Sequence, residues 1–186
     1  KMDLRVEYVT GRSKEKEKRK TIYTSSFLKE DRMPFWLMLI MAKMKSTEFI
    51  SFHDEGTLCG FVYMATIQNL TFVMFLAVDE NIRSKGYGSR ILDKIQSIHP
   101  DSKIIITIER CDKDAKDIEQ RIRRKKFYTN NGYIETGYLV ELAKKEQEII
   151  IKNGDFDEDE FSSFFKKYSN GTIKPKMWKM DHIQNI

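Results

Sequence analysis

The chain has 186 residues, 40% of them hydrophobic, so it can bury one substantial core but is short for two complete domains. Its 33 Lys and Arg against 28 Asp and Glu leave a net charge of +5, which is small for a chain in which 33% of the residues are charged. So small a charge gives only a modest attraction to phosphates and does not single out a nucleic-acid-binding protein. We therefore expect one domain over residues 2–186.

Cysteine usage and hydropathy bear on where the protein acts. Cys59 and Cys111 fit neither a CxxC metal motif nor a disulfide framework, so we expect two reduced thiols and a cytoplasmic protein. The start of the chain has no apolar signal region, and the most hydrophobic segment, residues 33–44, is too short to span ~30 Å of hydrocarbon. We expect neither secretion nor membrane association.

The first third of the chain predicts one strand, a charged segment and one helix. Residues 3–9 (DLRVEYV) alternate, with Leu4, Val6 and Tyr8 on one face, which is typical of a half-buried strand. The charged run KEKEKRK that follows has no clear helix start, and we expect it to be solvated, as helix or loop. The apolar segment FWLMLIMAKM after Pro34 predicts a buried helix that begins at the proline.

The middle of the chain predicts three consecutive antiparallel strands followed by a helix and a buried strand. The three strands are EFISFHD, LCGFVYMAT and LTFVMFLAVD. The helix RILDKIQSI carries apolar residues at helical spacing and stops before Pro100. The β-branched run IIITI, residues 104–108, suits a strand that is covered on both faces.

The last third predicts two helices and two strands. The basic segment RIRRKKFYTNNGY should form a helix that ends near Asn131 and Gly132 in a left-handed cap. TGYLVEL and EQEIIIK are strand candidates, and Asp157 with Glu160 three residues later predicts a capped helix.

The stretch SKGYGSR places two glycines where a strand passes into a helix. A dinucleotide-binding turn is excluded because Ile91 stands where a third glycine is needed, and a Walker loop is excluded because GxxxxGK[ST] is absent. The remaining anion site is a turn whose backbone N–H groups face a pyrophosphate at the positive end of the next helix. Gly86 and Gly88 would permit that close approach because they have no Cβ.

At these residues the chain resembles the GNAT superfamily of N-acetyltransferases. Arg83-Ser-Lys-Gly86-Tyr-Gly88 matches its signature Arg/Gln-x-x-Gly-x-Gly/Ala, and FVMFLAVDENI is similar to the bulged strand that precedes it. Phe127-Tyr128-x-x-x-Gly132-Tyr133 is similar to the family's second motif. One departure is Arg121, which stands where many relatives carry an asparagine that contacts pantetheine, so that contact is not carried over.

The resemblance implies a GNAT-type α/β fold, with a mixed, mostly antiparallel sheet of about seven strands that is splayed between strands 4 and 5 and flanked by helices. It implies acetyl-CoA as co-substrate and no metal. The cofactor-binding residues that it implies are Leu76, Ala77, Val78, Arg83, Ser84, Lys85, Gly86, Tyr87, Gly88 and Ser89. Among them, the backbone N–H of Val78 would polarise the thioester carbonyl.

Acetyl transfer to an amine requires a proton donor for the departing thiolate and a base for the amine. Tyr128 is the candidate acid, since a phenol held close to the sulfur and shielded from water can protonate it. Glu109, at the end of the buried strand, is the first candidate base, and Glu141 is the second. For either carboxylate, a structural or surface role is an equally good interpretation.

No covalent route is indicated by the sequence. Cys111 has no neighbouring histidine in sequence, and the three histidines, His53, His99 and His182, show no metal-ligand spacing. Direct attack in a ternary complex is therefore the simpler hypothesis.

The basic run from Arg121 to Lys126 is interpreted as a solvated helix face, with one or two of Arg121, Arg124 and Lys125 touching phosphate. We expect an N-acetyltransferase acting on a primary amine of a small molecule, with no nucleic-acid partner; a homodimer is left open. Acetylation of a protein or peptide amine is the close alternative. A non-catalytic acyl-CoA-binding sensor or interaction domain is the alternative from another class.

Overall fold

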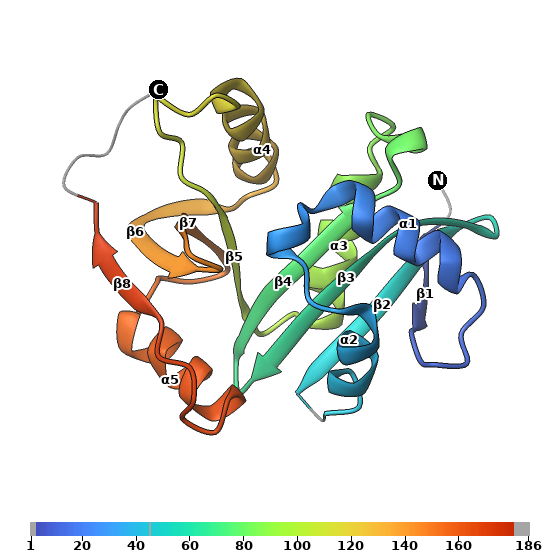
Figure 1. The fold of residues 1–186 in the computed structure, drawn as a ribbon, viewed down its shortest axis with the longest axis horizontal. Helices are drawn as coiled ribbons and strands as arrows, with labels where there is room; N and C mark the ends of the chain where they lie inside the picture. Colours follow the sequence, from blue (N-terminus) through green and yellow to red (C-terminus); the bar gives the residue numbers. More distant parts are fainter. Residues whose placement is uncertain (1–2, 45, 181–186) are drawn as a thin grey trace. The chain divides into compact units, whose positions relative to one another are not determined.

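The computed structural model describes residues 3–44 and 46–180 (Figure 1). The chain divides into two units. Unit 1 comprises the residues up to Thr66 together with Val73–Pro100, and unit 2 comprises Ile67–Phe72 together with the residues from Asp101 onward. The expected single domain over residues 2–186 stays a prediction.

Unit 1 contains β1 (Arg5–Tyr8), α1 (Lys16–Ser26), the 3-10 turn η1 (Lys29–Asp31), α2 (Phe35–Met41), β2 (Thr47–Asp54), most of β3 (Thr57–Ile67), the second part of β4 (Leu70–Val78), the 3-10 turn η2 (Glu80–Ile82) and α3 (Tyr87–Ile98). Unit 2 contains the first part of β4, then β5 (Lys103–Glu109), α4 (Ile118–Asn130), β6 (Ile134–Leu142), β7 (Lys145–Lys152), α5 (Glu158–Tyr168) and β8 (Lys176–Lys179).

The strands form a mixed, mostly antiparallel sheet of eight strands in the order β1-β2-β3-β4-β5-β7-β6-β8, in which β4 and β5 are parallel. The expected α/β fold with a mixed sheet flanked by helices is confirmed, with eight strands in place of about seven. Within unit 2, the first residue of β5 is joined to the residue before β4: the Lys103 N–H donates to the Asn69 carbonyl at 2.9 Å. The splay between β4 and β5 stays a prediction.

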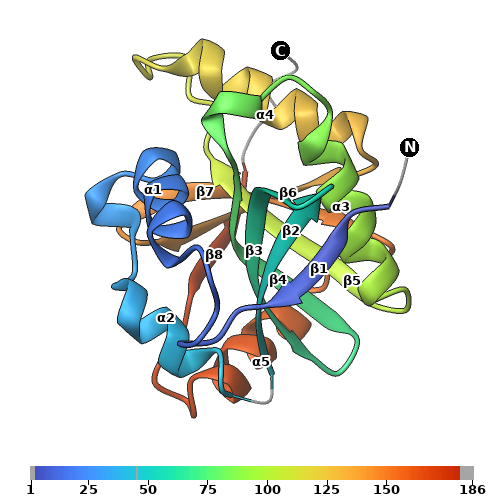
Figure 2. The ribbon, with the colours of Figure 1, turned by 90° about the vertical axis from the view of Figure 1, so that its right-hand side faces the viewer.

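Unit 1 is built around β2 and β3, which pair antiparallel over their length with β1 at the edge (Figure 2). Because side chains alternate along a strand, Phe49 of β2 and its neighbours Phe61 and Tyr63 of β3 share one face. They pack in one buried cluster with Tyr23 of α1 and Met38 of α2. The helices α1 and α2 therefore cover this face of the strands, and α3 lies on the other (Figures 1 and 2).

The amphipathic pattern of α3 is the one expected from the sequence. Ile91, Leu92 and Ile95 are buried, while Asp93 and Ser97 on the opposite side are exposed. In unit 2, α5 is held by a similar stripe of Phe161, Phe164 and Phe165, which pack edge-on around Phe72 at centroid distances of 5.4–6.0 Å.

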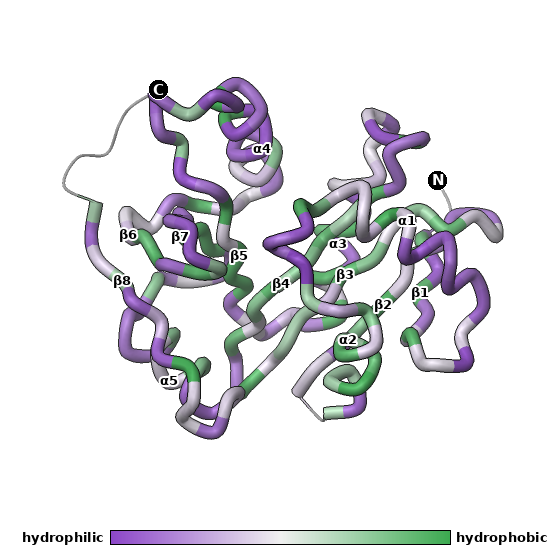
Figure 3. Tube along the Cα trace, in the orientation of Figure 1, coloured by the Kyte–Doolittle hydropathy of each residue, from purple (hydrophilic) through white to green (hydrophobic). Residues whose placement is uncertain are grey.

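Two expectations for the N-terminal third are wrong. The helix α2 is apolar throughout (Figure 3), yet only Met38 is buried, while Trp36 and Ile40 are 63% and 54% exposed. A helix of seven residues packs one side only, so its apolar character is no measure of its burial. Likewise Tyr8 of β1, expected to be buried with Leu4, is 56% exposed, and its hydroxyl donates to Glu48 Oε2 at 3.2 Å.

The charged run before Thr21 is also not fully solvated. It forms the start of α1, and Arg19 within it is 1% exposed. The Arg19 guanidinium donates from Nε to Ser51 Oγ at 2.6 Å and lies 3.7 Å from Glu7. A long side chain can bury its charged end where such partners are present, and local composition does not reveal the partners.

Among the described residues, no helix is both long enough and apolar enough to cross a membrane.

Candidate cofactor and catalytic residues

The end of β4 carries the first three expected cofactor residues, and it lies unusually close to β3. Leu76 and Val78 are half-buried and Ala77 is buried. A Cβ added to Gly60 of β3 would lie 2.2 Å from the Ala77 carbonyl oxygen, so only glycine permits this approach. Sequence reasoning missed Gly60, because nothing local distinguishes it from any other glycine in a strand.

The close approach coincides with an irregularity in β3. The register with β2 shifts between Phe52 and His53, which face Gly60 and Leu58, so that Cys59 is the extra residue of a bulge. The Cys59 carbonyl accepts a hydrogen bond of 2.8 Å from the N–H of Asp79, directly after β4. The bulge expected in β4 itself stays a prediction.

The turn after β4 is held by Asp79, which is 7% exposed. Its Oδ1 accepts hydrogen bonds of 3.1 Å from both the backbone N–H and the side-chain amide of Asn81, and its Oδ2 lies 3.9 Å from Lys18 Nζ. These contacts fix the direction in which the chain leaves the strand.

The glycine-rich loop then enters α3 through left-handed backbone. Ser84 has φ 69° and Gly86 has φ 80°, and the helix begins at Tyr87 with Gly86 as its N-cap. The first intrahelical bond runs from the Arg90 N–H to the Gly86 carbonyl, so the N–H groups of Tyr87, Gly88 and Ser89 have no partner within the helix. A Cβ on Gly86 would meet nothing within 4 Å. The loop therefore has donors and space that suit the pyrophosphate of acetyl-CoA.

The side chains of this loop divide into exposed and anchored groups. Arg83 and Lys85 are exposed, and the Arg83 guanidinium makes a contact of 3.4 Å with Ser26 Oγ. The Tyr87 hydroxyl donates to Asp54 Oδ2 at 2.7 Å, and Arg90 donates to the same oxygen at 3.2 Å. Tyr87 thus anchors the start of α3 to the end of β2.

In unit 2, the candidate base Glu109 is engaged by Arg121. Arg121 Nη2 lies 2.8 Å from Glu109 Oε2, while its Nε donates to Asp117 at 2.8 Å and its Nη1 donates to the Arg110 carbonyl at 2.9 Å. To accept a proton with Oε2, Glu109 would first have to release this guanidinium. The second candidate, Glu141, is exposed on β6 opposite Glu146 and Lys176.

The same helix, α4, is attached to the sheet through Lys125. Its ammonium donates to Glu148 Oε1 at 2.8 Å and pairs with Glu135. Burial acts to lower the pKa of Lys125, but the hydrogen bonds to these two carboxylates outweigh it and raise the pKa. Arg121 and Lys125 are engaged in ion pairs. Of the three residues expected to touch phosphate, Arg124 is the exposed one and is the remaining candidate.

Glu148 also accepts the Cys111 N–H at 2.8 Å and is only 4% exposed. The Cys111 thiol beside it is buried, and its pKa is raised to about 11 by burial and by the charge of Glu148. A thiol that stays protonated at neutral pH is a poor nucleophile.

Tyr128 is fixed by the way in which α4 ends. The Tyr133 N–H donates to the Tyr128 carbonyl at 3.1 Å, and the Gly132 N–H donates to the Thr129 carbonyl at 3.2 Å, with Gly132 at φ 88°. These two bonds are a Schellman motif, which requires a left-handed residue where the glycine stands. The left-handed cap expected near Gly132 is confirmed, and it explains the spacing Tyr-x-x-x-Gly-Tyr.

The rings complete the motif. Tyr128 and Tyr133 meet edge to face at 5.8 Å, and Phe127 contacts Tyr128 at 5.0 Å. Burial raises the pKa of Tyr128, and the charge of Arg124 partly opposes this. Burial likewise raises the pKa of Tyr133, whose hydroxyl has no hydrogen-bond partner in the described part of the chain.

Each unit thus positions its own set of expected residues: unit 1 holds the end of β4 and the loop 83–89, and unit 2 holds Glu109 and Tyr128. Across residues 3–44 and 46–180, no group of three or more His, Cys, Asp and Glu could hold a metal ion; His182 lies outside these residues. Transfer without a metal stays a prediction.

Comparison with known families identifies the domain that contains both motifs. Residues 45–135 match the family model described as "Acetyltransferase (GNAT) domain". This stretch forms a GNAT acetyltransferase domain. It runs from the start of β2 to the start of β6 and includes the glycine pair, Tyr128 and Tyr133. The chain is therefore an acyltransferase.

Solved structures share the GNAT fold over most of the chain. A putative GNAT-family acetyltransferase from Bacteroides thetaiotaomicron superposes with a TM-score of 0.72 at 17% identity, covering 88% of this chain and 94% of that one. An aminoglycoside 6'-N-acetyltransferase complexed with coenzyme A gives 0.62 at 13% identity, covering 82% and 99%. The PaiA N-acetyltransferase from Thermoplasma acidophilum, in complex with coenzyme A, gives 0.51 at 15% identity, covering 82% and 100%. These identities establish the fold alone, and no curated protein matches the sequence.

Proposed function

We propose that the protein transfers acetyl from acetyl-CoA to a primary amine of a small molecule, by direct attack in a ternary complex. The observation that carries this proposal is the loop 83–89, which lies in a GNAT acetyltransferase domain and presents the open positive end of α3. Two of the structures with the same fold are complexes with coenzyme A.

The cofactor side of the proposed site is formed by unit 1. The N–H groups from Ser84 to Ser89 and the exposed side chains of Arg83 and Lys85 bind the pyrophosphate, and the backbone of Leu76, Ala77 and Val78 binds the pantetheine arm. When bound, acetyl-CoA supplies the acetyl group as an activated thioester. The N–H of Val78 donates to the carbonyl oxygen as negative charge develops on it.

Acetyl transfer from sulfur to nitrogen requires two proton transfers. The amine nitrogen forms a bond to the acetyl carbon while the bond from that carbon to sulfur breaks; the nitrogen loses one proton and the departing thiolate gains one. Tyr128 gives the proton to sulfur. Its raised pKa keeps the phenol protonated at neutral pH, which is the state that a proton donor needs.

The amine proton is accepted by Glu109, directly or through water, in our proposal. Glu109 is held by Arg121, so the pair opens as the proton is transferred, or the second oxygen accepts it. Glu141 is the alternative acceptor.

Release of free CoA, followed over polyamines, aminoglycosides, amino acids and peptide N-termini, tests the activity and the acceptor class. We expect at least one small amine to stimulate release. Stimulation only by peptide N-termini would favour a protein-directed enzyme, and bound acetyl-CoA without release for any amine would favour a binding domain.

Tyr128→Phe tests the acid role, with Tyr133→Phe as the matched control. The control removes the same atom from a neighbouring ring whose hydroxyl has no partner among the described residues. We expect kcat to fall about 10²- to 10⁴-fold in Tyr128→Phe and to stay near that of the unmodified enzyme in Tyr133→Phe. Equal rates for the two variants with every active amine would remove Tyr128 from the mechanism.

A further inference from the structure

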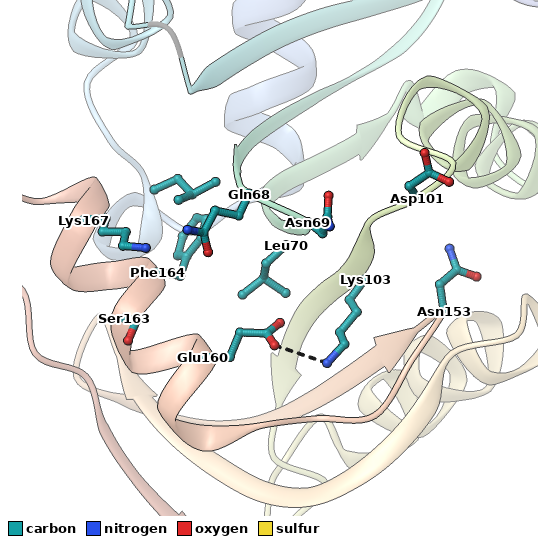
Figure 4. A pocket seen from close by; sticks show the side chains of 11 residues that line it. Gln68, Asn69, Leu70, Asp101, Lys103, Asn153, Glu160, Ser163, Phe164 and Lys167 are labelled. Carbon is teal, nitrogen blue, oxygen red and sulfur yellow. Dashed lines mark hydrogen bonds and ion pairs between the residues drawn. The ribbon is translucent and has the colours of Figure 1, made fainter.

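Unit 2 contains a pocket of about 560 Å³ that shares no residue with the proposed acetyl-transfer site (Figure 4). Its walls come from four places: the turn between β3 and β4, the start of β5, the end of β7, and one side of α5. Segments distant in sequence thus converge on one hollow, and acetyl transfer as proposed above makes no use of it.

The charged groups of this pocket are of both signs and are partly held in place. Lys103 Nζ lies 3.2 Å from Glu160 Oε2, and the two side chains point toward each other (Figure 4). A Cβ on Gly154 would lie 2.9 Å from Lys103 Cε, so the lysine stem packs directly on the glycine backbone. Glu160 is fixed at its backbone, because its N–H donates to Asp157 Oδ1 at 2.9 Å. The pair is therefore positioned by packing and by a helix cap.

A second pair of charges, Asp101 and Lys167, also lines the pocket and is exposed. Neutral groups lie between the charges: the amides of Gln68 and Asn69 can donate and accept hydrogen bonds. Phe164 contributes a buried apolar surface. The lining thus offers two cations, two anions and an apolar floor.

Because the lining holds two cations and two anions, a ligand of one sign would meet like charges as well as opposite ones. A small zwitterion satisfies both signs, with its carboxylate on Lys103 and its ammonium on Glu160. One ion pair is then replaced by two charge-assisted contacts. We propose that the pocket binds an α-amino acid with an apolar side chain.

The ligand class is tested by NMR titration of the full chain with L-leucine, N-acetyl-L-leucine and L-leucinamide, in the absence of acetyl-CoA. The three probes share a side chain but carry both charges, the negative charge only, and the positive charge only. We expect L-leucine to shift the backbone amides of Gln68, Asn69 and Ser163 and to bind about tenfold more tightly than either analogue. Equal affinity for one analogue, or shifts confined to residues 83–89, would overturn the proposal.

Glu160→Gln should weaken L-leucine binding about tenfold, because a charged acceptor is lost. Its matched control is Glu158→Gln, which neutralises an exposed carboxylate of the same helix turn outside the pocket. Lys103→Met tests the other sign, because it removes the cation on which the carboxylate is placed and keeps the apolar stem that packs on Gly154. Unchanged affinity in both Glu160→Gln and Lys103→Met would refute this site.

Discussion

Gly60→Ala should disturb both the stability of unit 1 and the strand that we assign to pantetheine binding. The new Cβ would lie 2.2 Å from the Ala77 carbonyl oxygen, and since Cβ atoms essentially never come within 3.0 Å of another heavy atom, the strands must separate by at least about 0.8 Å. The same movement would stretch the adjacent Asp79 to Cys59 hydrogen bond from 2.8 Å to about 3.6 Å, beyond hydrogen-bonding range. Strain and the lost bond together should cost about 1–3 kcal/mol.

Urea unfolding of Gly60→Ala and of Gly11→Ala measures this effect. Gly11 is a matched control, because a Cβ there would meet nothing within 4 Å and its φ is not positive. We also expect weaker binding of CoA by calorimetry in Gly60→Ala, since Ala77 and Val78 must move. A free energy of unfolding within about 0.5 kcal/mol of the Gly11→Ala value, with unchanged CoA affinity, would refute the reasoning.

Three further experiments test the packing of unit 2. Lys125→Met leaves Glu148 buried without its cation and should destabilise the protein by about 3–5 kcal/mol in urea; a loss below about 1 kcal/mol would show that the pair does not anchor α4. With a pKa of about 11, the Cys111 thiol stays protonated at pH 8, so alkylation by iodoacetamide should be slow in the folded protein and fast in urea; rapid alkylation without urea would contradict its burial. Asp157→Ala removes the cap of α5 and should cost about 1 kcal/mol with CoA affinity unchanged; an unchanged melting temperature would mean that the cap contributes nothing.

Patterns read along the chain located most of the regular elements. The helix α3 was predictable because burial on one side imposes the spacing of Ile91, Leu92 and Ile95, and the strands around Phe49 were predictable from their β-rich runs. β8 was not predicted: its four residues carry only two apolar side chains, and pairing with β6 makes it a strand. The prediction that α2 is buried was wrong, because the sequence of an apolar helix of two turns does not indicate which side is covered.

The candidate site was predictable where its geometry is local. The Gly132 cap and the position of Tyr128 follow from six consecutive residues, because both bonds of the motif close within them. The pairing of Glu109 with Arg121 was not predictable, since it depends on how the start of α4 lies against the end of β5. Gly60 was missed for the same reason: its partner, Ala77, belongs to another strand.

The position at which α4 ends determines the direction in which the Tyr128 side chain points. Gly132 ends the helix, so the side of the helix on which Tyr128 lies depends on the number of residues between Tyr128 and Gly132. One inserted or deleted residue would turn the phenol by about 100° while leaving the composition of the segment almost unchanged. Insertions and deletions should therefore preserve activity in the polar connection before α4. They should abolish activity in the three residues between Tyr128 and Gly132.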